Sequence, residues 1–365
     1  MDFNLSGEQQ LLRDGLNKFL TTRYDLDKSR AAAKTGAGWQ PDIWRAFADE
    51  LGILGATLPE AAGGMGGGPV EVMLIAEELG RAGVIEPFID TVVVAGGLLQ
   101  RAGATEVLGR VADCVARGVR SECADGSAVV ALAADPACHA VGDGGNWVLT
   151  GSPAVVMNAP LATHLLLAAR TGDHVGLFLT TADLPMHPYR TVDDRRAADI
   201  CVDGLRLPAD ALIDDDATAS LEQAYDEGAA AVCAEAVGAL RRVLADTVAY
   251  CKQRQQFGQP IGGFQALQHR MVDMHMDVEQ AVAAAYLATL NLGADPARRA
   301  RAVSAAKATV GRAARFVGQN AVQLHGGMGM TEELAIGHYF KRLTALQYEF
   351  GSTDFHRSRY AALTR

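Results

Sequence analysis

The sequence has no apolar run long enough to cross a membrane. Its densest apolar stretch, TVVVAGGLL at positions 91–99, is half of the roughly 18 residues that a membrane span requires, and two glycines interrupt it. The first residues, MDFNLSGEQQ, form neither the basic n-region nor the apolar h-region of a signal peptide. We therefore expect a cytoplasmic protein that does not enter a membrane.

A basic excess is also missing. The formal net charge is −10 and the sequence pI is about 5.4. Lysine and arginine form no cluster that could follow a phosphate backbone, so nucleic acid is not an expected partner.

Paired cysteines are missing as well, because the sequence has no CxxC motif. In a chain of this size without a visible signal peptide, isolated cysteines indicate free and mostly buried thiols, as in a reducing compartment. We predict neither a disulfide nor a metal site. The six cysteines are Cys114, Cys123, Cys138, Cys201, Cys233 and Cys251.

Aromatic residues make up only 6% of the 365 residues, although 49% are hydrophobic. Alanine and glycine account for much of the difference, which favours closely packed helices. Three regions differ in their residue pattern. We predict an N-terminal α-helical domain over residues 1–125, a middle β domain over 126–215 and a C-terminal helical bundle over 216–365.

Local patterns predict where individual helices lie. Ser6 and Gln9 form a capping-box pattern before a helical repeat of apolar residues. Two further N-terminal helices are expected over 41–55 and 69–83. Three long alanine-rich helices, over 220–256, 263–293 and 296–327, predict an antiparallel bundle.

Two motifs in the last third, RQQFGQPIGGFQALQHRMVDM (254–274) and QLHGGMGMTEE (323–333), resemble those of the acyl-CoA dehydrogenase family. The resemblance covers almost the whole chain. It implies an α+β fold with an N-terminal helical domain, a middle β-barrel-like domain and a C-terminal four-helix bundle. It also implies FAD as cofactor, an acyl-CoA thioester as substrate and electron-transfer flavoprotein as electron acceptor.

The resemblance implies which residues hold the adenosine-diphosphate half of a flavin whose ring lies in a neighbouring subunit. A planar, always-charged guanidinium suits the pyrophosphate, amide side chains offer donors, and glycines let the backbone come close. The structural alternative is that the arginine and the glycines only end helices. The predicted FAD-contacting residues are Arg254, Gln256, Phe257, Gln265, Gln323, Gly326 and Gly327.

The part of the family site that contacts the flavin ring and the thioester is altered. Where the family's first β-domain signature has threonine, this chain has Ala134, and no Gly-Ser follows Asp135. In the second signature, Val155 replaces an aromatic residue and Met157 replaces a threonine, so that only Asn158 is retained. Loss of a hydroxyl in favour of apolar groups favours packing over ring binding.

The catalytic base of the family has no clear counterpart. Ungapped counting from Gln323 places Phe350 at the base position, one residue after Glu349. In members that carry the base on the helix before RxxFG, the matching position is Gly228. Since a register error of one residue turns a helical side chain by about 100°, neighbouring acids are poor substitutes. We favour Glu349 as an unrelated acidic residue, although one gap in a loop would make it the base.

These features predict the partner subunit of a heteromeric α2β2 acyl-CoA dehydrogenase. It would complete the FAD site of a catalytic subunit, and the assembly would act on a bulky acyl-CoA such as a steroid side-chain remnant. No residue of this chain is then catalytic. The alternative is a self-sufficient homotetrameric flavoenzyme with Glu349 as base, and a more remote one is a scaffold that binds no nucleotide.

Overall fold

The computed structural model describes residues 5–60, 64–102, 119 and 122–364. The chain forms two compact units, each built from separate segments. One unit comprises Met1–Leu26, Pro69–Val84 and Ala229–Arg365, and the other comprises Asp27–Gly68 and Ile85–Gly228. The three consecutive domains expected over 1–125, 126–215 and 216–365 stay a prediction.

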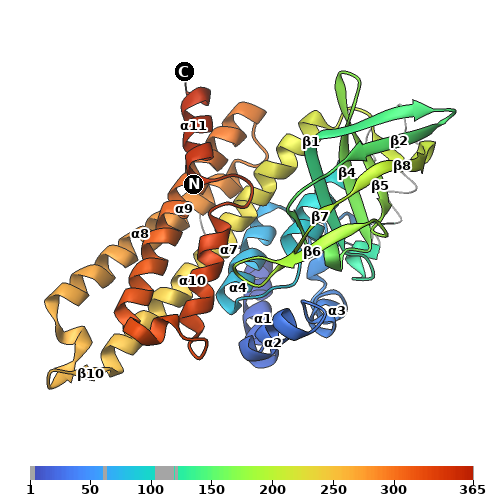
Figure 1. Ribbon diagram of the computed structural model, residues 1–365. Coiled ribbons are helices and arrows are strands. Elements are labelled where there is room, and N and C mark those ends of the chain that lie inside the picture. The colour runs from blue at the N-terminus through green and yellow to red at the C-terminus, as the bar shows by residue number, and fades with distance from the viewer. Residues whose placement is uncertain (1–4, 61–63, 103–118, 120–121, 365) are drawn as a thin grey trace. The chain divides into compact units, whose positions relative to one another are not determined.

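The first unit is helical (Figure 1). Its N-terminal helix α1 carries the predicted capping box, because the Ser6 side chain accepts from the Gln9 N–H and the Gln9 side chain accepts from the Ser6 N–H. In the bundle that follows, α8 packs along α9. The helices are α1 (Gly7–Arg23), α4 (Pro69–Ala82), α7 (Thr218–Gln253, which begins in the other unit), α8 (Gln265–Leu290), α9 (Pro296–His325), α10 (Ala335–Leu346) and α11 (Thr353–Leu363).

Glycine allows α4 and α7 to come close within this unit. A Cβ on Gly80 would collide with the Glu235 carbonyl, and one on Gly238 would collide with the Glu77 carbonyl. The alanine-rich middle of α7 is buried against its neighbours. Small residues thus set the spacing of the bundle, as the low aromatic content predicts.

A short hairpin and two 3-10 turns connect the bundle helices. The hairpin follows α7, and another turn follows α9. Their bounds are β10 (Gln255–Gln256), β11 (Gln259–Pro260), η6 (Ile261–Gly263) and η7 (Gly326–Met330).

The second unit contains two sheets and short helices. The six-stranded sheet has the order β8-β2-β1-β4-β5-β9, and only β1 and β4 pair in parallel. The three-stranded sheet has the order β3-β7-β6. A hydrophobic core cluster of the second unit includes Phe178, Leu165 and Leu149. The strands are β1 (Val130–Asp143), β2 (Asn146–Gly151), β3 (Val156–Met157), β4 (His164–Thr171), β5 (His174–Thr181), β6 (Met186–Arg190), β7 (Arg196–Ile200), β8 (Val202–Pro208) and β9 (Leu212–Asp214).

The helices of the second unit are shorter than the sequence suggests. The helix expected over 41–55 ends at Asp49, because Gly52 adopts a left-handed backbone and a 3-10 turn follows. The apolar stretch at 91–99 begins in a π-helix. The helical elements are α2 (Leu26–Thr35), α3 (Pro41–Asp49), η1 (Ile53–Gly55), η3 (Ile89–Ala95), α5 (Gly96–Ala102), η4 (Ala159–Leu161) and η5 (Ala209–Ala211).

The predicted order of helices, then strands, then helices is confirmed. Among the described residues no helix is both long and apolar enough to span a membrane. Four of the described cysteines are buried, and Cys201 is exposed, whereas Cys114 lies outside the described residues. Burial raises the pKa of the Cys123 thiol to about 12 and that of the Cys233 thiol to about 12, so both are poor nucleophiles.

Candidate functional site

Arg254 lies where the long helix α7 ends and the β10–β11 hairpin begins. The two residues at the hairpin tip, Phe257 and Gly258, have positive φ values of 54° and 76°, as a two-residue hairpin turn requires. The Phe257 side chain is 90% exposed. The Arg254 side chain is exposed too, and no partner for it is found among the described residues. The hairpin thus presents an aromatic group and a cation to the surface.

A second exposed stretch follows the end of α9. Gly326 caps this helix with a φ of 61°, a backbone conformation that favours glycine. A Cβ at Gly326 or at Gly327 would meet nothing within 4 Å, so the backbone there is open to a ligand or to another chain. Gln323, on the last turn of α9, is exposed beside it.

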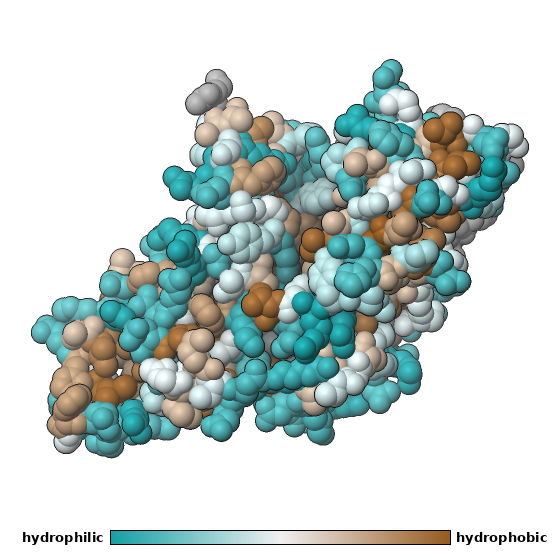
Figure 2. Space-filling view, viewed as in Figure 1, coloured by the Kyte–Doolittle hydropathy of each residue, from teal (hydrophilic) through white to brown (hydrophobic). Residues whose placement is uncertain are grey.

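The two stretches lie at the same end of the helical unit. Tyr250, one turn before Arg254, stacks on His325, the last residue of α9, with ring centroids 4.3 Å apart. Gln256 in β10 and Gln265 at the start of α8 are exposed at this end as well. Figure 2 shows apolar residues gathered over the same end, around the β10 hairpin.

These residues fit the ADP half of FAD. A diphosphate is a doubly charged acceptor, which an unpartnered guanidinium binds with two parallel hydrogen bonds. Amide side chains and open glycine backbone can supply further donors to the same ligand. All of them are exposed, so these described residues form an open surface and not an enclosed pocket.

The residues expected to line a flavin ring do not fit that role. Val155 has a φ of 54° and a side chain that is 60% exposed. Met157 in β3 is half-buried, and neither side chain carries a hydrogen-bond donor. Ala134 lies at an irregularity of β1, where the register to β4 shifts between Ala134 and His139.

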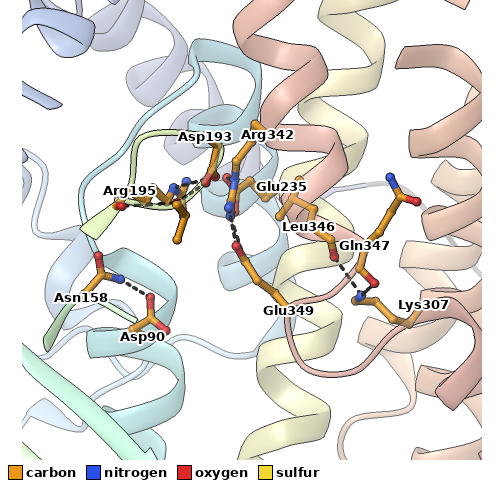
Figure 3. A network of polar contacts seen from close by, with 11 residues as sticks. Asp90, Asn158, Asp193, Arg195, Glu235, Lys307, Arg342, Leu346, Gln347 and Glu349 are labelled. Atoms are coloured by element: carbon orange, nitrogen blue, oxygen red, sulfur yellow. Dashed lines mark hydrogen bonds and ion pairs between the residues drawn. The ribbon is translucent and has the colours of Figure 1, made fainter. Parts of the chain in front are cut away.

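Asn158, the one retained residue of the second signature, is already paired within the protein. It is 1% exposed and has a left-handed backbone with a φ of 58°. Its side-chain Nδ2 donates to Oδ2 of Asp90, 2.5 Å away (Figure 3). The donor that could have bonded a flavin is therefore directed at a carboxylate of the same unit.

Glu349 is held by an arginine. Nη1 and Nη2 of Arg342 donate to Oε1 and Oε2 of Glu349, the latter at 3.0 Å. On its other side the same guanidinium donates to both carboxylate oxygens of Glu235, at 2.8 Å each. Figure 3 shows Arg342 between the two acids. The three side chains are 10%, 5% and 17% exposed for Arg342, Glu235 and Glu349, so this is a largely buried ion cluster.

A buried lysine fixes the backbone of the turn that carries Glu349. Lys307, on α9, is 1% exposed. Its Nζ donates to the carbonyl oxygens of Leu346, Gln347 and Gly351 at 2.9, 3.2 and 3.0 Å. Burial lowers the pKa of Lys307 below its ordinary value of 10.5. The lysine satisfies the last carbonyls of α10, which a helix end would otherwise leave without partners.

A histidine holds the next carbonyl of the turn. Nε2 of His356 lies 2.8 Å from the Phe350 carbonyl oxygen, to which it must donate, and Nδ1 lies 3.4 Å from the Ser304 hydroxyl. Phe350 and Gly351 have positive φ values of 53° and 104°. Bonds from three helices therefore hold the turn in one shape, with the Glu349 carboxylate directed at Arg342.

The second possible base position, Gly228, also lacks a carboxylate. Its neighbour Glu227 accepts from Nη1 of Arg101 at 3.0 and 3.1 Å. Asp226 is 1% exposed and has a partner within the protein. Within the described part of the chain, no group of three or more His, Cys, Asp and Glu residues could hold a metal ion.

Sequence reasoning singled out Glu349 but missed Glu235 and the two cations, Arg342 and Lys307, that hold Glu349 and its turn. Arg342 lies on the buried face of α10 together with Tyr339 and Leu346. Lys307 likewise lies on a buried face of α9. A charged residue within an apolar helical stripe is the signal that could have identified both.

Two family models match the chain. The acyl-CoA dehydrogenase N-terminal domain matches residues 6–118, and the acyl-CoA dehydrogenase C-terminal domain matches residues 218–363. Among named proteins, acyl-CoA dehydrogenase IpdE2 of Mycolicibacterium smegmatis is 31% identical over 339 residues, which is 93% of each chain. IpdE2 of Mycobacterium tuberculosis is also 31% identical, over 92% of this chain and 90% of its own.

Solved structures show the same fold. A steroid ACAD variant, Tcur3481–Tcur3483, is 28% identical with a TM-score of 0.86, over 98% of this chain and 97% of that one. The ChsE4–ChsE5 complex from Mycobacterium tuberculosis has a TM-score of 0.90 at 24% identity, over 99% of this chain and 98% of that one.

Proposed function

The chain belongs to the acyl-CoA dehydrogenase family, and we propose that it is the partner subunit of a heterotetrameric enzyme, completing the FAD site of a catalytic subunit. One contrast carries the proposal. Arg254, which would bind the diphosphate, is exposed and without a partner among the described residues. Glu349, the nearest candidate for a base, has both oxygens bonded to Arg342.

The residues of this chain then act on the cofactor rather than on the substrate. FAD, when bound, supplies the acceptor for the hydride that leaves the acyl chain. Arg254 would neutralise the diphosphate, while Gln323 and Gln265 would donate to the ADP portion. The open backbone at Gly326 and Gly327 would let that portion come close. Proton removal from the acyl α-carbon would fall to the catalytic subunit.

The identity of the relatives supports a bulky substrate. The Tcur3481–Tcur3483 structure is a steroid ACAD by its name, which joins two designations. We propose by analogy that the assembly containing this chain is an α2β2 tetramer that oxidises a bulky, steroid-derived acyl-CoA thioester. Electron-transfer flavoprotein would reoxidise its flavin.

Cofactor content tests the proposal. We expect the chain purified alone to contain little FAD, because Val155 and Met157 offer no hydrogen-bond donor to a flavin ring. Tagged and isolated from its native cells, the chain should bring down a second chain of similar size together with flavin. The measurement is flavin absorbance per protomer. A yellow homotetramer with one FAD per protomer, obtained from the single chain, would refute the partner-subunit assignment.

The alternative function is a homotetramer in which Glu349 is the base, and Glu349→Gln separates it from the proposal. We expect turnover of the assembled enzyme to stay within a few-fold of wild type, because Glu349 is directed at Arg342. Folding should persist, since Arg342 keeps its bonds to Glu235. Loss of a general base typically lowers turnover by about 10²–10⁴-fold.

The matched control is Glu333→Gln, which neutralises an exposed carboxylate of the same unit. Both variants are assayed at equal FAD content. A hundredfold loss in Glu349→Gln alone would make Glu349 the base and favour the homotetrameric enzyme.

A further inference from the structure

Two aromatic rings join the ends of α7 and α9. The rings of Tyr250 and His325 are stacked, with centroids 4.3 Å apart and an interplanar angle of 27°. Tyr250 lies outside the two motifs that indicate FAD binding, and His325 lies within the second motif but is not among the residues expected to contact FAD. Each one immediately supports such a motif, because Tyr250 lies one helical turn before Arg254 and His325 directly precedes Gly326.

Hydrogen bonds fix the histidine ring in its place. Nδ1 of His325 lies 2.8 Å from the Ala321 carbonyl oxygen. A carbonyl only accepts, so Nδ1 carries the hydrogen and donates it. The Tyr250 hydroxyl reaches the His325 carbonyl oxygen at 3.5 Å. His325 is 5% exposed, so its ring contacts neighbouring residues and is not accessible to a ligand.

The stack is connected through the backbone to the residues on either side. The Arg254 N–H donates to the Tyr250 carbonyl at 2.8 Å, and the Ile261 N–H donates to the Arg254 carbonyl at 2.8 Å. These bonds attach the hairpin to the end of α7. On the other side, a Cβ at Gly329 would lie 3.1 Å from the His325 Cβ, so the turn after α9 packs closely on the histidine.

We infer that Tyr250 and His325 are positioning residues that set the spacing between the Arg254 guanidinium and the Gly326–Gly327 backbone for the diphosphate and adenosine of FAD. The inference rests on the proposed function. A single ligand must be reached by both stretches at once, and both stretches are exposed. A fixed spacing lowers the cost of ordering both stretches when the ligand binds. A packing contact alone would stabilise the bundle without changing affinity for FAD.

Ring-removing and ring-keeping variants separate these roles. In the assembled enzyme, Tyr250→Leu and His325→Gln should each weaken FAD binding by about three- to tenfold, the range that a stacked aromatic pair supports. His325→Gln keeps a donor for the Ala321 carbonyl. This variant therefore tests the inference even where Tyr250→Leu fails to fold. Tyr250→Phe keeps both rings and the hydrogen bond from His325 to the Ala321 carbonyl, and it should bind FAD within about twofold of wild type.

A double variant shows whether the stack acts through Arg254. With Arg254→Ala present, His325→Gln should cost little further affinity, because there is no guanidinium left to position. FAD affinity is measured by titration of the flavin-depleted complex, with the thermal midpoint recorded for each variant. Equal FAD affinity in His325→Gln and wild type, or additive losses in the double variant, would overturn the inference. If Arg254→Ala alone leaves FAD affinity unchanged, the proposed half-site itself is wrong.

Discussion

Replacing Arg254 with alanine should lower the affinity of the assembled enzyme for FAD by about ten- to a hundredfold, since a charge-assisted contact is worth about 1.5–3 kcal/mol. The physical reason is local. The guanidinium is exposed at the end of α7, and the described residues offer it no partner, so its hydrogen bonds are available for a diphosphate. FAD retained after dialysis, measured against protein concentration at limiting FAD, gives the occupancy.

The matched control is Arg301→Ala. Arg301 is exposed near the N-terminal end of α9, so the substitution removes the same charge at the opposite end of that helix. We expect FAD occupancy and thermal midpoint to equal those of wild type. Equal occupancy in Arg254→Ala and Arg301→Ala would mean that Arg254 only ends a helix, and the half-site would have to be abandoned.

Family, fold and cofactor could be predicted because their signals are local. The periodicity at 220–256, 263–293 and 296–327 gave α7, α8 and α9 to within three residues at each end. Family membership confirms the predicted enzyme class, which oxidises a CH–CH bond of an acyl-CoA, and FAD as its cofactor. The roles of individual residues around the FAD stay predictions.

The ion pairing of the Glu349 carboxylate could not be predicted, because it depends on residues far away in sequence. Glu235 comes from α7, Lys307 from α9 and Arg342 from α10. No spacing rule links these positions, and only packing of the bundle brings them to one turn. Ungapped counting along the chain predicts Phe350 at the base position, but it could not show where the Glu349 carboxylate is directed.

The backbone conformation of the turn at Phe350 also could not be predicted from the sequence. A positive φ, as at Phe350, is uncommon for a residue with a bulky side chain, and the local sequence YEFGST does not predict it. The structure supplies the reason, because Lys307 donates to the carbonyls of Gln347 and Gly351 on either side of this residue, and His356 donates to the Phe350 carbonyl itself. Three-dimensional bonds thus override the local preference of the backbone.

The largest effect on stability is expected from Arg342→Met. The substitution leaves the carboxylates of Glu235 and Glu349 facing each other in a largely buried place without their shared cation. Removing one partner of a buried ion cluster typically costs about 3–5 kcal/mol of the free energy of unfolding. Arg242→Met is the control, because Arg242 pairs with Asp246 one turn away and both side chains are partly exposed. It should cost no more than about 0.5 kcal/mol.

A second substitution tests whether the loss of stability comes from the two carboxylates that no longer share the Arg342 cation. Glu235→Gln in the Arg342→Met background neutralises one of the two carboxylates that have lost this cation. It should restore about half of the lost free energy of unfolding. Urea unfolding at one fixed protein concentration gives the free energies, since assembly makes them depend on concentration. If Arg342→Met cost no more than Arg242→Met, the guanidinium would not be what holds Glu349. The carboxylate would then be free to turn elsewhere, and the homotetrameric enzyme with Glu349 as base would become the better reading.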